Sequence, residues 1–178
     1  MIVAGFDLAT TSGCAILDGT KVLHVEAHRP AGKEDPEIFH GFRIWFRGML
    51  LGHSVQEVAI EQPLVTNIAA PDTRPNAKPG QTHNPVTMKT YLRLYGLRAH
   101  AVEICAALNI PCREVHQASW RKSFTGNGRA TKEDTLKLAQ RLVPGLKSKD
   151  AGEAVGIAWH LNGELSRVPE VDLFTGAA

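Results

Sequence analysis

Two carboxylates in this sequence stand at the ends of apolar runs, where a charged group needs a partner. Asp7 follows the apolar residues 2–6, and Glu61 follows a second apolar run at residues 55–60. Runs of this length, bounded by polar turn residues, are typical of buried strands. An unpaired buried charge costs several kcal/mol, and ligands of open α/β sheets gather outside the carboxyl ends of strands. Glu61 alone would be an ordinary surface glutamate; together with Asp7 it indicates a shared site.

Two further carboxylates lie on the first turn of a predicted helix. Ser148 is a suitable N-cap, and we expect the helix to run through Asn162 to a terminating Gly163. Asp150 and Glu153 are three residues apart, so both side chains project from one helix face. The partly positive helix N-terminus favours their ionised forms. The helix is rich in alanine and glycine, which predicts that its backbone lies close to a sheet.

These four acids could together hold metal ions. Clustered carboxylates repel one another unless cations lie between them, and oxygen ligands of this kind favour Mg²⁺ or Mn²⁺. The cysteines and histidines offer no zinc-like set. Two such ions about 3.5–4 Å apart can support phosphodiester hydrolysis. The alternative, four unrelated acids on separate surfaces, stays open because spacing along the chain does not fix distances in space.

The elements that must position these acids form an α/β domain. In chain order we expect strands at residues 2–6, 14–17 and 21–28, a helix at 35–51, a strand at 55–60, a helix at 88–108, a strand at 110–115, and helices at 131–143 and 148–163. The first three strands would form a β-meander. Thr131 and Asp134 form a variant of the capping box at the start of the helix at 131–143. We predict neither a helix nor a strand for residues 116–130. The predicted fold is a mixed five-stranded sheet flanked by helices.

Composition indicates a single domain over residues 1–178, with a net charge of +2 and 43% hydrophobic residues. Cys14, Cys105 and Cys112 form no C-x-x-C pair, so reduced thiols in a cytoplasmic protein are expected. No signal peptide is evident, and no apolar run approaches the ~18 residues of a membrane helix, so we expect no membrane contact.

Two other segments bear on function. Basic residues outnumber acids between residues 113 and 149, which suggests a surface for a polyanion or simply a solvated basic face. A long loop at residues 62–87 holds half of the ten prolines. It could be a flap over a substrate or an idle insertion. A tail at residues 164–178 follows the last helix.

Five short segments resemble, in order, the RuvC-type Holliday junction resolvases of the ribonuclease H-like superfamily, in particular their phage-type members. They are GFDLATTSG at residues 5–13, AIEQ at 59–62, GLRAHA at 96–101, GNGRATK at 126–132 and KDAGEAVGIA at 149–158. Each segment is short, and the resemblance is specific because all five occur in the family's order. Together they place four acidic residues at the family's positions. The family implies the ribonuclease H-like fold and a bacterial or phage-encoded cytoplasmic protein.

The resemblance also implies a structure-selective endonuclease that resolves Holliday junctions with Mg²⁺ or Mn²⁺, most simply two ions. Family members are homodimers, and the predicted helix at residues 88–108, apolar over more than one face, is the expected contact. The matching catalytic and metal-binding carboxylates are Asp7, Glu61, Asp150 and Glu153. The basic residues expected to contact DNA are Arg121, Lys122, Arg129 and Lys132.

The chain departs from the family pattern at a few positions. Leu8 and Ala9 replace a Pro-Gly pair, Glu153 stands where aspartate is commoner, and Leu64 falls near an aromatic wedge. Three alternatives accompany the resolvase prediction. One is a less selective nuclease for flaps and branched DNA, and another is a DNA-binding protein without catalysis. The third is a phosphate-binding ATPase of the actin or sugar-kinase type, whose first motif also reads Asp-Leu-x-Thr-Thr-Ser.

Overall fold

The centre of the molecule is a five-stranded mixed sheet. A computed structural model describes residues 1–63 and 87–166. The strands are β1 (Ile2–Asp7), β2 (Ser12–Asp18), β3 (Lys21–His28), β4 (Glu57–Glu61) and β5 (Cys112–Val115), in the spatial order β3-β2-β1-β4-β5. The pairs β1–β2 and β2–β3 are antiparallel, whereas β1–β4 and β4–β5 are parallel. The predicted mixed sheet with an opening meander is confirmed.

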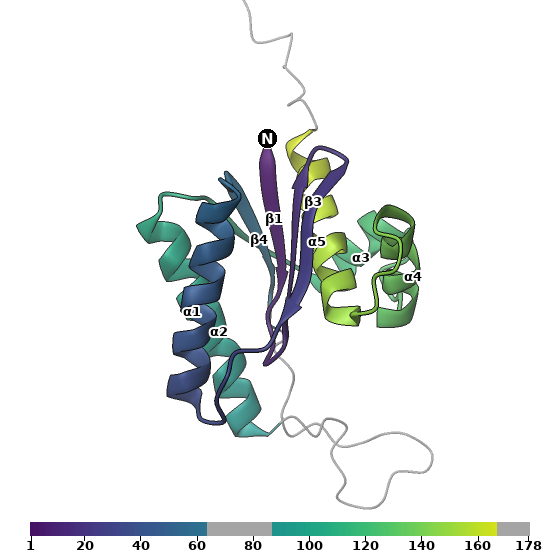
Figure 1. Ribbon diagram of the computed structural model, residues 1–178. Coiled ribbons are helices and arrows are strands. Elements are labelled where there is room, and N and C mark those ends of the chain that lie inside the picture. The colour runs from purple at the N-terminus through teal and green to yellow at the C-terminus, as the bar shows by residue number, and fades with distance from the viewer. Residues whose placement is uncertain (64–86, 167–178) are drawn as a thin grey trace, which may run out of the picture.

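Helices cover both faces of this sheet (Figure 1). They are α1 (Asp35–Gly52), α2 (Met88–Ala107), α3 (Gln117–Thr125), α4 (Lys132–Leu142) and α5 (Lys149–Leu165). The pair α1 and α2 lies on one face, and α5 lies on the other with α3 and α4 beside it. Strand β1 is therefore central in the sheet and covered on both sides.

The face beneath α1 and α2 is packed with aromatic side chains. Phe42, Trp45 and Phe46 recur on one side of α1 and are buried against the sheet. Phe46 lies 4.4 Å from Phe6 of β1, measured between ring centroids. This helix forms because its apolar residues recur at three- and four-residue intervals. These apolar residues of α1 are therefore part of the hydrophobic core.

The face beneath α5 is packed with small side chains instead. Eight successive residues of α5, from Ala151 to Ala158, are buried. Gly13 of β2 faces the helix backbone so closely that a methyl group there would overlap the carbonyl group of Asp150. The Ala- and Gly-rich composition therefore brings the start of α5 directly against the strands, as its sequence predicted.

Several element boundaries differ from the predicted ones. The sequence predicted no helix at the position of α3. This helix ends at Gly126, whose φ of 81° is left-handed, as is common for a glycine at a helix C-terminus. The last helix continues past Gly163 to Leu165, because glycine in a helix interior costs only about 1 kcal/mol. Its predicted N-cap, Ser148, accepts a bond from the Ala151 amide, and the predicted capping box of Thr131 is also present.

Some sequence predictions fall outside the described residues. They include most of the loop at 62–87, the possible wedge residue Leu64 and most of the tail at 164–178. Within residues 1–63 and 87–166, no helix combines the length and apolar character needed to cross a bilayer.

Candidate active site

All four predicted acids lie at one end of the sheet. Asp7 ends β1 and Glu61 ends β4, and the parallel register pairs Phe6 with Ile60, so the two acids follow side by side. Helix α5 begins at the same edge because Gly13, the register partner of Asp7, contacts its first turn. The topology therefore assembles the acids from three elements that are distant in sequence.

Three of the acids converge closely. Carboxylate oxygens of Asp7, Asp150 and Glu153 all lie within 4.8 Å of one another, and across residues 1–63 and 87–166 this is the one group arranged to hold a metal ion. Asp7 and Glu153 are buried, with 7% and 1% of their surface exposed. Buried acids this close repel strongly, so the arrangement needs positive charge to be stable.

Glu61 lies beside this group rather than within it. Its carboxylate accepts a hydrogen bond from Gln117 Nε2 at 3.0 Å and another from Trp120 Nε1 at 2.8 Å. Burial raises the pKa of Glu61, and repulsion from Glu153 adds to the rise, while the Trp120 bond opposes it. Glu61 is therefore close enough to the cluster to share its electrostatics.

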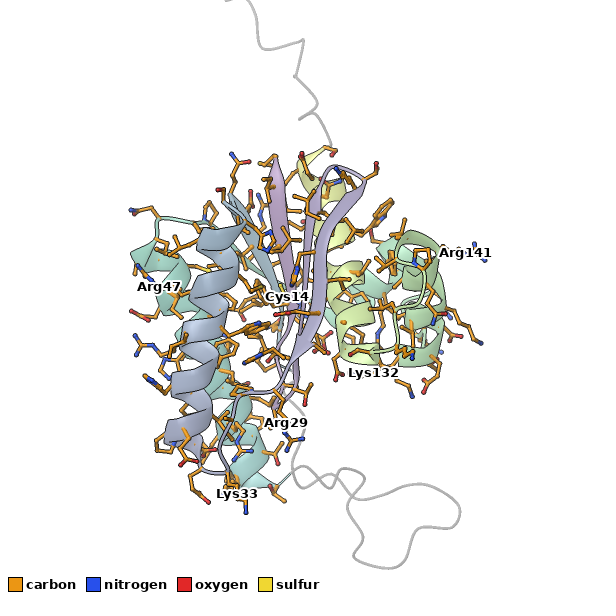
Figure 2. All side chains as sticks on the ribbon, in the orientation of Figure 1. Cys14, Arg29, Lys33, Arg47, Lys132 and Arg141 are labelled. Carbon is orange, nitrogen blue, oxygen red and sulfur yellow. The ribbon has the colours of Figure 1, made fainter. Side chains whose placement is uncertain are left out.

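Two basic side chains supply positive charge inside the cluster. Lys132 Nζ lies 3.4 Å from Asp7 Oδ2 and 3.0 Å from Asp150 Oδ1, and it also contacts Glu153 Oε2. Arg121 pairs with the other oxygen of Glu153. Figure 2 shows Lys132 at the lower end of the α4–α5 side, where the strands bearing Asp7 and Glu61 also end.

The pKa values report how tightly charge is crowded here. Burial raises the pKa of Asp7 to about 8, with the Lys132 ammonium opposing the rise and the neighbouring carboxylates Glu153, Glu61 and Asp150 adding to it. Burial lowers the pKa of Lys132, but Asp7, Glu153 and Asp150 outweigh that effect and raise it overall. Even with Lys132 present, Asp7 binds a proton more readily than an ordinary aspartate.

The donor set fits a hard divalent cation. Every candidate ligand atom is a carboxylate oxygen, which is the chemistry that Mg²⁺ and Mn²⁺ prefer. The ammonium group of Lys132 stands where three carboxylates converge, as a cation would. When all four carboxylates are ionised, as in binding a cation, they carry two more negative charges than Lys132 and Arg121 offset.

The four basic residues predicted to bind DNA fall into two pairs. Arg121 and Lys132 are paired with the acids, whereas Lys122 and Arg129 are exposed. Their contact with DNA stays a prediction. Sequence reasoning did not single out Gln117 and Trp120 as partners of Glu61. Their three-residue spacing puts them on one face of α3. The sequence around them does not indicate that this face lies against Glu61.

Comparison of the sequence with models of known protein families and with curated proteins finds no match. Comparison with solved structures does find proteins of similar fold. Thermus thermophilus RuvC is similar at 16% sequence identity and a TM-score of 0.65, covering 90% of this chain and 92% of that one.

Two further structures extend this similarity. T. thermophilus RuvC in complex with Holliday junction substrate is 12% identical, with a TM-score of 0.70, over 93% of this chain and 96% of that one. The yeast mitochondrial Holliday junction resolvase is 12% identical, with a TM-score of 0.58, over 93% and 81%. At these identities the likeness establishes the fold, and the RuvC-like, ribonuclease H-like architecture predicted from the sequence is confirmed.

Proposed function

We propose that this protein is a metal-dependent endonuclease that hydrolyses phosphodiester bonds of branched DNA, with four-way junctions as its main substrate. The observation that carries the proposal is the convergence of Asp7, Asp150 and Glu153, with Glu61 beside them, at one end of the sheet. The fold shared with solved Holliday junction resolvases supports the choice of substrate.

In this proposal the four carboxylates hold Mg²⁺ or Mn²⁺, most simply two ions. Such ions supply Lewis-acid stabilisation of the charge that develops on phosphate oxygens. The protein contributes the fixed geometry, since Asp7 and Glu61 are held by the sheet and Asp150 and Glu153 by the first turn of α5.

The basic residues have a second task in the same proposal. The Lys132 side chain is 43% exposed, so it can turn from the carboxylates toward a phosphate once divalent ions neutralise them. Lys122 and Arg129 are exposed nearby in the chain and are suited to the DNA backbone. Contacts of this type give salt-sensitive binding with little sequence preference.

We also propose that two copies associate through α2. This helix exposes Met88 and Leu92, with 57% and 60% of their surface accessible, and Ile44 of the adjacent α1 is 64% exposed. Exposed apolar side chains on neighbouring helices are suited to a partner surface. The single nuclease domain over residues 1–178 and the cytoplasmic location stay predictions from the sequence.

The test uses labelled four-way junction, replication fork, flap and linear duplex, each with Mg²⁺ and with Mn²⁺. We expect cleavage of the junction and the loss of at least about 10²-fold in rate for Asp7→Asn and Glu61→Gln, with DNA binding retained. Asp18→Asn is the matched control, because Asp18 pairs with Ile2 at the opposite end of the sheet.

Each outcome decides one part of the proposal. Equal cutting of linear duplex would remove the junction selectivity and leave a general nuclease. No cutting with either metal would remove the nuclease, and ATP binding in its place would favour the phosphate-binding ATPase.

A further inference from the structure

One short helix holds Glu61 by both of its carboxylate oxygens. Gln117 Nε2 donates to Oε1 at 3.0 Å and Trp120 Nε1 donates to Oε2 at 2.8 Å, and both donors belong to α3. We propose that Gln117 and Trp120 are positioning residues that orient Glu61 as a metal ligand. The inference rests on the proposed function only in taking Glu61 to bind a divalent cation.

The Trp120 side chain is placed for this bond by the core. Trp120 is fully buried, and the absence of a side chain at Gly156 of α5 leaves room for its ring. A tryptophan indole has one donor and no acceptor. Leaving that donor unpaired in the core would cost about 1–3 kcal/mol, so the bond to Glu61 is strongly favoured.

The two bonds leave Glu61 free to bind a cation. An ionised carboxylate offers about four lone-pair positions, and one on each oxygen is used here. The backbone is fixed as well, because the Gln62 amide donates to the Val115 carbonyl oxygen at 2.9 Å. With backbone and both oxygens held, the remaining lone pairs keep a constant direction.

The same helix also orients a second acid. Arg121, next to Trp120 in sequence, pairs with Glu153, and its guanidinium carbon lies 5.2 Å from the centre of the Trp120 ring. Consecutive residues of α3 therefore hold Glu61 and Glu153, which come from β4 and α5. Partners of this kind orient metal ligands, and their loss typically weakens metal binding by about 10–100-fold.

The first measurement is Mn²⁺ binding to the full chain by titration calorimetry, without DNA. We expect Gln117→Leu and Trp120→Phe each to weaken binding by about 10-fold or more. Gln140→Leu is the matched glutamine control, since Gln140 also donates one bond, to the Leu146 carbonyl oxygen. Trp159→Phe is the matched tryptophan control, and both controls should bind Mn²⁺ as the parent does.

The second measurement separates positioning from simple packing. In a nitrogen–proton NMR spectrum each of the three tryptophans gives one indole signal. Mg²⁺ should shift the Trp120 signal and leave that of Trp159 in place, because only Trp120 donates to a ligand of the ion. Trp120→Phe assigns the signal by removing it.

The inference would be overturned if Gln117→Leu and Trp120→Phe both bound Mn²⁺ as tightly as the parent does. It would also be overturned if the Trp120 indole signal did not shift when Mg²⁺ is added. If Trp120→Phe does not fold, Gln117→Leu and the NMR signal still decide. A parent protein that binds metal through Glu61 but cuts no DNA would overturn the proposed function and leave this inference standing.

Discussion

The two faces of the sheet are packed in different ways. Beneath α1 and α2, Phe6, Phe42 and Phe46 fill the space between layers with large rings. Beneath α5 the layers meet through alanine and glycine, and the helix backbone touches the strands. Both faces bury apolar surface, but only the second controls a distance between polar groups.

The difference shows what small residues achieve in this fold. A rotating or slightly shifted aromatic ring changes little beyond packing, whereas the Gly13 contact fixes how far Asp150 stands from Asp7. One face therefore contributes mainly stability, and the other contributes stability and geometry together. Substitutions on the two faces should separate these contributions.

The largest effect is expected for Gly13→Ala. The added methyl group would overlap the Asp150 backbone and push the start of α5 away from the sheet. We expect a loss of about 3 kcal/mol in stability, measured by urea unfolding. Cleavage by the molecules that remain folded should also fall by at least about 10²-fold, because the carboxylates separate.

Gly48→Ala is the matched control for this change. Gly48 is exposed on α1 and an added methyl group would meet nothing within 4 Å. It should stabilise the protein by up to about 1 kcal/mol and leave cleavage unchanged. Full cleavage by Gly13→Ala would mean that the small-residue contact does not set the geometry of the acids.

A smaller effect is expected for Leu50→Ala on the aromatic face. Leu50 is buried in the last turn of α1, which leads to the start of β4 and so lies at the far end of the sheet from Asp7. The lost packing should cost about 2–3 kcal/mol in urea unfolding. Cleavage per folded molecule should stay at the parent rate; a selective loss of cleavage would erase the distinction between the faces.

The smallest effect is expected for Asp7→Asn in metal-free protein. This substitution should stabilise the protein, whereas Gly13→Ala and Leu50→Ala should destabilise it. The pKa of Asp7 is about 8 in the folded protein and 3.8 as the ordinary value. The folded state thus binds this proton more tightly, and the parent loses stability as the pH rises through that window. Asparagine stays uncharged, so it avoids this loss.

The variant should therefore be more stable by at least about 1 kcal/mol at pH 9, or about 2–4 °C in melting temperature, and the difference should shrink as the pH falls toward 3.8. Thermal unfolding in a chelator measures the difference. A variant less stable than the parent at pH 9 would show that Lys132 compensates Asp7 fully.

The positions of the four acids could be predicted because local patterns carry them. Asp7 and Glu61 end apolar runs, and Asp150 and Glu153 share one helical turn, so parallel strands and a capped helix suffice. The small residues of α5 indicated the face on which that helix packs. The ordered resemblance then indicated that these elements meet.

The surroundings of the acids could not be predicted in the same way. Helix α3 has only nine residues and buries only Trp120 and Phe124, so the sequence offers too few apolar positions to predict it. The position of Lys132 among Asp7, Asp150 and Glu153 depends on how α4 packs on α5, which no local pattern encodes. Basic residues predicted as a DNA surface thus proved to be ion-pair partners of the acids as well.

The chain order of the site has a consequence for the protein during its synthesis. Asp7 and Glu61 are made early, but Asp150 and Glu153 arrive only with α5, after all five strands and the four helices α1 to α4 have been synthesised. A growing chain therefore cannot assemble the four carboxylates before α5 is complete. Any hydrolytic chemistry of this site is withheld from the nucleic acids that surround translation.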